Sequence, residues 1–110
     1  MADIDFPKMI RDMIEAAKGQ LTNHWKEAKP YMENETRAFA ENIKLVAKLK
    51  LAGSISEEQA RLYIEIQKNS MRIVLLTIEG LGILAVEAAI NAAIDVVRST
   101  VNTALGWAIL

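Results

Sequence analysis

The uneven distribution of charge along this chain of 110 residues constrains its fold more than any other feature. Residues 71–110 carry five charged side chains, whereas residues 1–70 carry 22. Proteins rarely leave large contiguous apolar surfaces in water, so this C-terminal segment must be covered by other parts of the chain, by a second chain or by lipid. We therefore expect the rest of the molecule to pack around residues 71–110.

Helical spacing divides the C-terminal segment into two apolar faces. The first, called the small-residue ladder below, consists of Gly82, Ala85, Ala89, Ala92, Val96, Ser99, Thr103 and Gly106. The second is bulky and consists of Ile83, Val86, Ile90, Val97, Val101 and Ala108. Small residues let another backbone approach closely, while a bulky face is typical of a bundle core. Two faces predict neighbours on both sides of this helix, some of them from another chain.

Composition indicates an all-α protein. Aromatic residues make up only 5% of the chain, and the commonest residues are those that favour helices. The formal charge of −1 gives no basic excess for nucleic acid. The chain has no cysteine, and its start lacks the basic and apolar regions of a secretory signal. We therefore expect a cytoplasmic protein that does not bind nucleic acid.

Residues from about 7 to 51 are expected to form one long helical arm. Asp3 and Asp5 lie just before Pro7, where carboxylates favour the positive end of a helix dipole and proline loses no hydrogen bond. Pro30 lacks the N–H that would bond the carbonyl four residues earlier, so it kinks or ends the helix. A kink is the expected outcome, because no turn-forming cluster surrounds Pro30 and the apolar spacing resumes directly after it.

Residues 52–56 form the clearest turn in the sequence. Gly53 suits the left-handed position just past a helix end, and Ser56 with Gln59 matches a capping box. A second arm from about 57 to 108 would follow. Two arms of similar length predict an antiparallel hairpin roughly 65–75 Å long at 1.5 Å per residue.

The second arm contains two glycines that leave its continuity open. Gly80 and Gly82 either receive bulky side chains from the first arm or break the second arm. The first interpretation gives a single all-helical domain, residues 1–110, that assembles as a dimer or higher homo-oligomer into a helical bundle. The second gives a monomeric four-helix bundle with corners near Pro30, Gly53 and Gly80.

Few residues have the arrangement that catalysis or metal binding needs. His24 is the only histidine, and Leu21 stands where the Glu-x-x-His pair of a carboxylate-bridged metal site needs a glutamate. We predict no catalytic, metal or cofactor-binding residue. His24, Lys26 and Glu79 form a possible buried polar cluster, because a buried Glu79 needs a cationic partner or a raised pKa.

Five polar residues of the last helix share an arc between its two apolar faces: Glu87, Asn91, Asp95, Arg98 and Asn102. This arc could be an internal hydrogen-bonded ladder, the lining of a pore, or a solvated surface. The solvated surface is favoured, because spacings of three and four residues make ordinary surface pairs such as Asp95 with Arg98.

Three classes of function follow from these features, and a helical protein that self-associates in a structural or protein-interaction role is favoured over an enzyme. A membrane-active hairpin of holin-like or pore-forming type is the first alternative, since residues 73–94 are long enough to span a bilayer. Two carboxylates and an asparagine offset their apolar side chains, and no basic cluster flanks them. A binder of apolar ligands is the second alternative.

The small-residue ladder predicts that Ala92→Leu disrupts self-association, because the larger side chain overpacks a close helix contact. Asn102→Ala, on the polar arc, should have little effect. Light scattering would measure the oligomer mass of both variants. An unchanged mass and stability for Ala92→Leu would remove the ladder as an interface.

Overall fold

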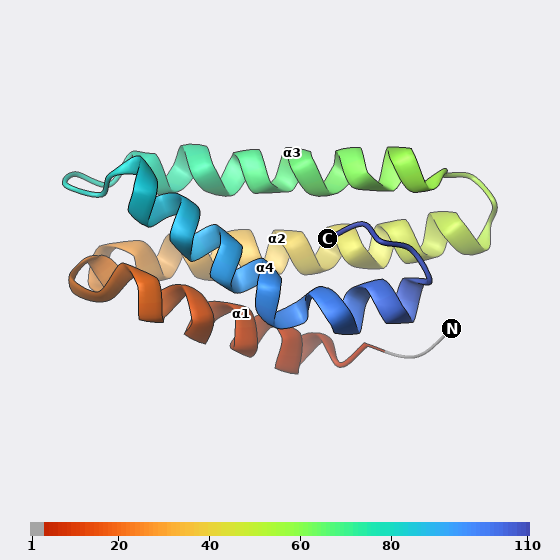
Figure 1. Ribbon diagram of the computed structural model, residues 1–110, viewed down its shortest axis with the longest axis horizontal. Coiled ribbons are helices and arrows are strands. Elements are labelled where there is room, and N and C mark those ends of the chain that lie inside the picture. The colour runs from red at the N-terminus through yellow and green to blue at the C-terminus, as the bar shows by residue number, and fades with distance from the viewer. Residues whose placement is uncertain (1–3) are drawn as a thin grey trace.

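A computed structural model describes residues 4–110, which fold into four helices connected by short turns (Figure 1). The helices are α1 (Phe6–Leu21), α2 (Trp25–Leu51), α3 (Glu57–Leu76) and α4 (Ile83–Leu105), and a 3-10 turn, η1 (Thr22–His24), joins α1 to α2. The predicted all-α helical bundle is confirmed. Asp5 caps α1 by accepting a hydrogen bond from the Lys8 backbone N–H, whereas Asp3 lies outside the described residues.

Successive helices run in opposite directions, as Figure 1 shows. Lys44, late in α2, places its Nζ 4.9 Å from the centre of the Phe6 ring at the start of α1. Arg61, early in α3, donates from Nε to the backbone oxygen of Ala108, beyond the end of α4, at 3.1 Å. Each helix thus packs beside two others, α1 and α3 lying on either side of α4. The arrangement is an up-down-up-down four-helix bundle.

The predicted hairpin of two uninterrupted arms is corrected by this arrangement. The longest dimension of the bundle is 44 Å, and α2 alone accounts for about 40 Å at 1.5 Å per residue. The first arm reverses at η1, and the second reverses at residues 77–82. The connectivity is that of the four-helix alternative, except that its first corner lies at η1 and not at Pro30.

Pro30 lies inside α2, close to its start, and does not mark a corner. One missing N–H so near a helix start removes a single hydrogen bond, which the packing of a long helix tolerates. The corner is made by Thr22, whose φ of 41° is rare for a β-branched residue, and by Asn23. Thr and Asn side chains are common in turns, so the pair Thr22-Asn23 favoured a turn at this position over one at Pro30.

The turn between α2 and α3 matches its prediction. Gly53 has a φ of 67°, in the left-handed region that ends many helices. The Ser56 hydroxyl accepts a bond from the Gln59 N–H at 3.1 Å, and the Gln59 side chain accepts one from the Ser56 N–H at 2.9 Å. The capping box therefore sets the start of α3.

The core runs the length of the bundle and takes large apolar side chains from all four helices. Its largest fully buried members are Phe39, Met13, Leu21, Met32, Ile43, Ile64, Met71, Leu75, Ile90, Leu105, Val46 and Val86. Helix α4 packs beside α1 and α3. Its bulky face is buried at Val86, Ile90, Val97 and Val101, whereas most of its small-residue face stays exposed. The chain thus supplies one of the two coverings that the sequence predicts for α4, and association through the small-residue ladder stays a prediction.

A buried polar group fixes the alignment of α2 against α3. Gln67 of α3 accepts a bond from the Asn42 amide at 2.6 Å and donates one to Glu35 at 2.7 Å. Glu35 also accepts a bond from the Ser70 hydroxyl at 3.0 Å. Sliding α3 along α2 would leave the buried Gln67 amide unpaired, which costs more than the bonds themselves contribute.

The turn between α3 and α4 depends on Gly80. Its φ is 84°, and a Cβ at this position would lie 3.3 Å from Nε2 of His24. We predict that Gly80→Ala lowers the free energy of unfolding by about 1–2 kcal/mol, because an L side chain is strained in this region. Chemical denaturation would measure the change.

Gly82 provides the matched control for Gly80. Its φ is −83°, and a Cβ there would meet no atom within 4 Å. Gly82 is the N-cap residue of α4, where alanine is less favourable, but alanine also restricts the unfolded chain, so Gly82→Ala should change stability by only about 0.5 kcal/mol. Equal losses in the two variants would show that the backbone conformation of Gly80 does not control the turn.

Candidate interaction surface

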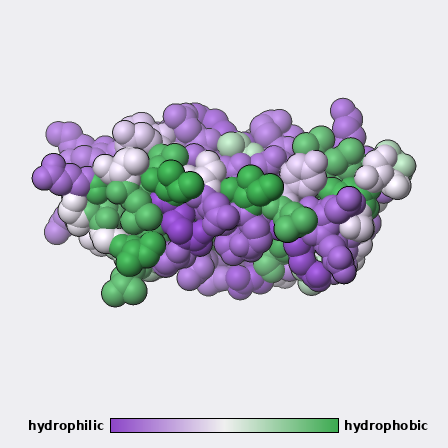
Figure 2. Space-filling model, turned by 90° about the horizontal axis from the view of Figure 1, so that it is seen from above, coloured by the Kyte–Doolittle hydropathy of each residue, from purple (hydrophilic) through white to green (hydrophobic). Residues whose placement is uncertain are grey.

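Helix α3 has a second apolar stripe on the side that faces solvent. The side chains of Leu62, Ile66, Ile73 and Leu76 remain 63%, 67%, 66% and 42% exposed. Together with Asn69 they alternate steps of four and three residues, so they share one helix face, and these five residues are called the outer stripe below. Figure 2, which views the bundle from the α3 side, shows separate apolar groups along this face with polar groups between them.

The outer stripe continues into further apolar surface at both ends. Beside its N-terminal half lies a groove of about 330 Å³ between α3 and the end of α2. The groove is lined by Leu49, Ser54, Ile55, Gln59, Leu62, Tyr63 and Ile66. Near its C-terminal end α4 begins with the exposed residues Ile83 and Leu84, and Leu84 is 85% exposed. Apolar side chains are thus accessible along the whole length of α3.

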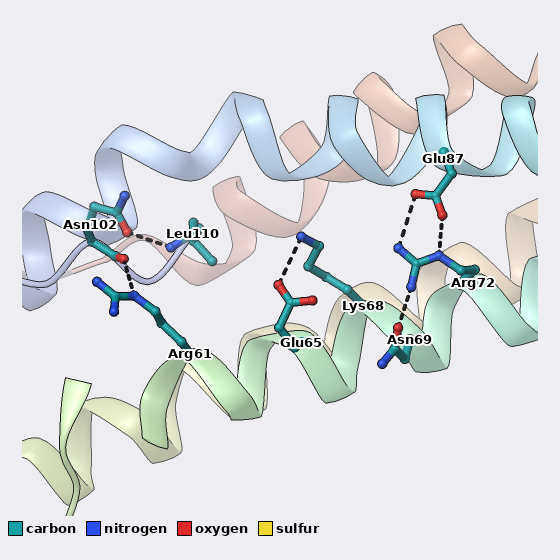
Figure 3. A network of polar contacts seen from close by, with 9 residues as sticks. Arg61, Glu65, Lys68, Asn69, Arg72, Glu87, Asn102 and Leu110 are labelled. Atoms are coloured by element: carbon teal, nitrogen blue, oxygen red, sulfur yellow. Dashed lines mark hydrogen bonds and ion pairs between the residues drawn. The ribbon is translucent and has the colours of Figure 1, made fainter. Parts of the chain in front are cut away.

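Charged residues border the outer stripe on the side of α4 (Figure 3). Arg72 donates from Nε and Nη2 to the two carboxylate oxygens of Glu87 on α4, and from Nη1 to the Asn69 side-chain oxygen. The hydrogen bond from Arg72 lowers the pKa of Glu87, while partial burial acts in the opposite direction. The Nζ atom of Lys68 lies 3.4 Å from a carboxylate oxygen of Glu65. The border therefore carries both signs of charge in fixed positions.

The small-residue ladder is only partly available to another molecule. Ala89 is fully buried in the core, and Ala85 and Ala92 are half-buried. The exposed members are Gly82, Val96, Ser99, Thr103 and Gly106. The buried and half-buried members lie in the first half of α4, where the rest of the bundle covers part of the ladder. Its role as an oligomer interface stays a prediction.

The possible polar cluster gathers at one end of the bundle but is not buried. Lys26 and Glu79 are exposed and line the same surface hollow, between the start of α2 and the turn that follows α3. His24 is half-buried, beside Gly80. Water solvates both charges, so Glu79 does not need the buried partner that the sequence suggested.

The polar arc of α4 is exposed at Asn91, Asp95 and Arg98, as predicted, whereas Glu87 and Asn102 are half-buried. Asp95 and Arg98 form the expected ion pair at 2.6 Å. Asn102 is half-buried, and its side-chain oxygen accepts bonds from the N–H groups of Ile109 and Leu110, both at 3.0 Å (Figure 3). These bonds hold the C-terminal segment on the bundle. Asn102→Ala removes them, so it should lower the stability of the bundle, while its predicted small effect on self-association stays a prediction.

Two further observations bear on the alternatives from the sequence. Within residues 4–110, no three His, Asp or Glu side chains come together as a metal site would require. None of the helices in this part of the chain combines the length and apolar character that crossing a membrane needs. Residues 73–94 are divided between the end of α3, a turn and the start of α4.

Comparisons with protein-family models, with curated proteins and with solved structures gave no match for this chain.

The pair of Arg72 and Glu87 predicts a pH-dependent contribution to stability. Because the pKa of Glu87 is lowered by folding, its carboxylate stabilises the bundle above its ordinary pKa of 4.5, and this stabilisation is lost as the pH falls through the lowered value. Glu87→Gln should therefore be less stable than the unchanged protein at pH 7, by less than about 1 kcal/mol for a partly exposed pair.

Thermal unfolding between pH 3 and 7 would measure this difference. Asp95→Asn is the matched control, because Asp95 pairs with Arg98 on the surface of a single helix. The difference in unfolding temperature between Glu87→Gln and the unchanged protein should disappear below pH 4.5. A difference that widens as the pH falls would contradict the role assigned to Glu87.

Proposed function

We propose that this protein is a non-enzymatic helical module that self-associates, in a structural or protein-interaction role, through the outer stripe of α3. The observation that carries the proposal is the exposure of four large apolar side chains at helical spacing on a face that no part of the described chain covers. Large apolar side chains in a row on one helix face are what a helix presents when a partner helix packs against it.

The energy available from the outer stripe is comparable with the cost of association. Complete burial of a Leu or Ile side chain contributes about 1.5–3 kcal/mol, and roughly half to two-thirds of that remains available in these partly exposed residues. Eight such side chains from two copies therefore supply roughly 7–14 kcal/mol if all are fully buried. Association costs about 4–15 kcal/mol. The two ranges overlap, so the stripe supplies free energy of the size that a weak, reversible dimer needs.

The charges of α3 favour a second copy of the chain as the partner. The helix carries three acidic residues, Glu57, Glu58 and Glu65, and three basic residues, Arg61, Lys68 and Arg72. Helices that lie on membrane surfaces carry an excess of Lys and Arg on the polar face, and an acidic partner would need a similar excess. A surface with equal numbers of acidic and basic residues is complementary to a second copy of the same surface.

Apolar-ligand binding is a second candidate, favoured by the groove between α2 and α3. Its lining residues Leu49, Ile55 and Tyr63 provide an apolar wall with a phenol at its edge. Native mass spectrometry of the purified protein would detect a bound lipid or other apolar molecule. Retention of such a molecule by the isolated protein would support this candidate.

Ile66→Lys should weaken self-association by at least roughly 30-fold in Kd, because each of two copies loses a buried apolar side chain and places a charge in the contact. Analytical ultracentrifugation would measure the dissociation constant. The fold should persist, since Ile66 points into solvent.

Two variants serve as controls for Ile66→Lys. Leu45→Lys adds the same charge to the exposed side of α2, near Glu41 and Lys44, and should leave the dissociation constant unchanged. Val96→Lys adds it to the small-residue ladder. Dissociation by Val96→Lys with no effect of Ile66→Lys would assign the interface to the ladder and contradict the proposal.

A further inference from the structure

We infer that two copies pair through their α3 helices in antiparallel orientation, centred between Gln67 and Lys68. This inference rests on the proposed function, since it assumes that the outer stripe is the surface of self-association. It adds the orientation of the two copies and the residues that meet.

The spacing of the outer stripe fits an antiparallel partner. From Leu62 to Ile73 its positions follow steps of four, three and four residues, which are the same when read from either end. An antiparallel copy therefore brings these four positions into register, while Leu76 lies opposite the partner's Gln59. Leu62 meets the partner's Ile73, and Ile66 meets the partner's Asn69, each contact occurring twice by symmetry.

The charges beside the stripe are complementary in the same register. Glu65 precedes Ile66 and Arg72 precedes Ile73, so both lie on the side of the stripe next to α4. Antiparallel pairing places Glu65 against the partner's Arg72, again twice by symmetry. Parallel pairing places Glu65 beside the partner's Ser70, where it meets no opposite charge.

The orientation of Asn69 supports the same choice. In parallel dimers an asparagine in the contact stripe commonly pairs with its copy, which would favour that orientation here. The Asn69 side-chain oxygen, however, already accepts a bond from Arg72, which draws the amide toward the charged border. An antiparallel pair keeps this bond and sets the same Arg72 against the partner's Glu65.

Cysteine cross-linking tests the orientation directly, because the full chain contains no cysteine. Leu62→Cys and Ile73→Cys would be oxidised separately and as an equimolar mixture. In the antiparallel pair, position 62 lies about 16 Å along the axis from its own copy, too far for a disulfide. We expect a cross-linked heterodimer in the mixture and little product from either variant alone. Leu45→Cys, on α2, controls for random collision.

The remaining outcomes separate the orientation from the function. Efficient cross-linking of Leu62→Cys to itself would show parallel pairing and overturn the inference while leaving self-association in place. No product in any combination, together with a monomeric mass, would overturn the proposed function as well. A dimeric mass without any product would show that the copies meet through another surface.

Discussion

The reversal of the chain between α3 and α4 determines which surfaces remain for interaction. Gly80 adopts a left-handed conformation there, and the most apolar helix turns back between α1 and α3. Its bulky face then contributes to a core shared by all four helices. If α3 and α4 formed one helix, the small-residue ladder would need a partner from outside, but the folded chain already covers part of it.

Helix α3 consequently becomes the helix with an uncovered apolar face. Its inner face, with Ile64, Met71 and Leu75, is buried, and its outer stripe faces solvent on the opposite side. The polar group around Gln67 fixes α3 against α2, and the ion pair of Arg72 with Glu87 holds it to α4. A helix held on both flanks presents its outer stripe as a rigid surface, which reduces the entropy lost when a partner binds.

Short sequence motifs predicted where individual helices begin and end. The positions at which the chain reverses depended on several competing preferences. The capping box at Ser56, the left-handed Gly53 and the cap at Asp5 are short-range features, and all three are present. Pro30 was expected to mark the bend because its effect on a helix is well defined. The reversal occurs instead at Thr22 and Asn23, where the individual preferences are weak and the packing of α1 against α4 decides the outcome.

The candidate surface could have been found from the sequence but was not. Leu62, Ile66, Ile73 and Leu76 have helical spacing, but charged residues stand between them in the sequence and break up the apolar pattern. Helix α3 has two apolar stripes with helical spacing, and only the packing of the whole bundle shows which of them lies in the core. The spacing of the residues does not distinguish the two. The half-buried Asn102 was missed for a similar reason, since its partners lie in the C-terminal segment that folds back onto α4.

The mass of the unmodified protein in detergent-free solution, measured by light scattering over a range of concentrations, tests the central claim most directly. Pairing through the outer stripe predicts a mass that rises with concentration toward twice the 12.2 kDa of the chain. A mass that stays at 12.2 kDa at every concentration would contradict self-association.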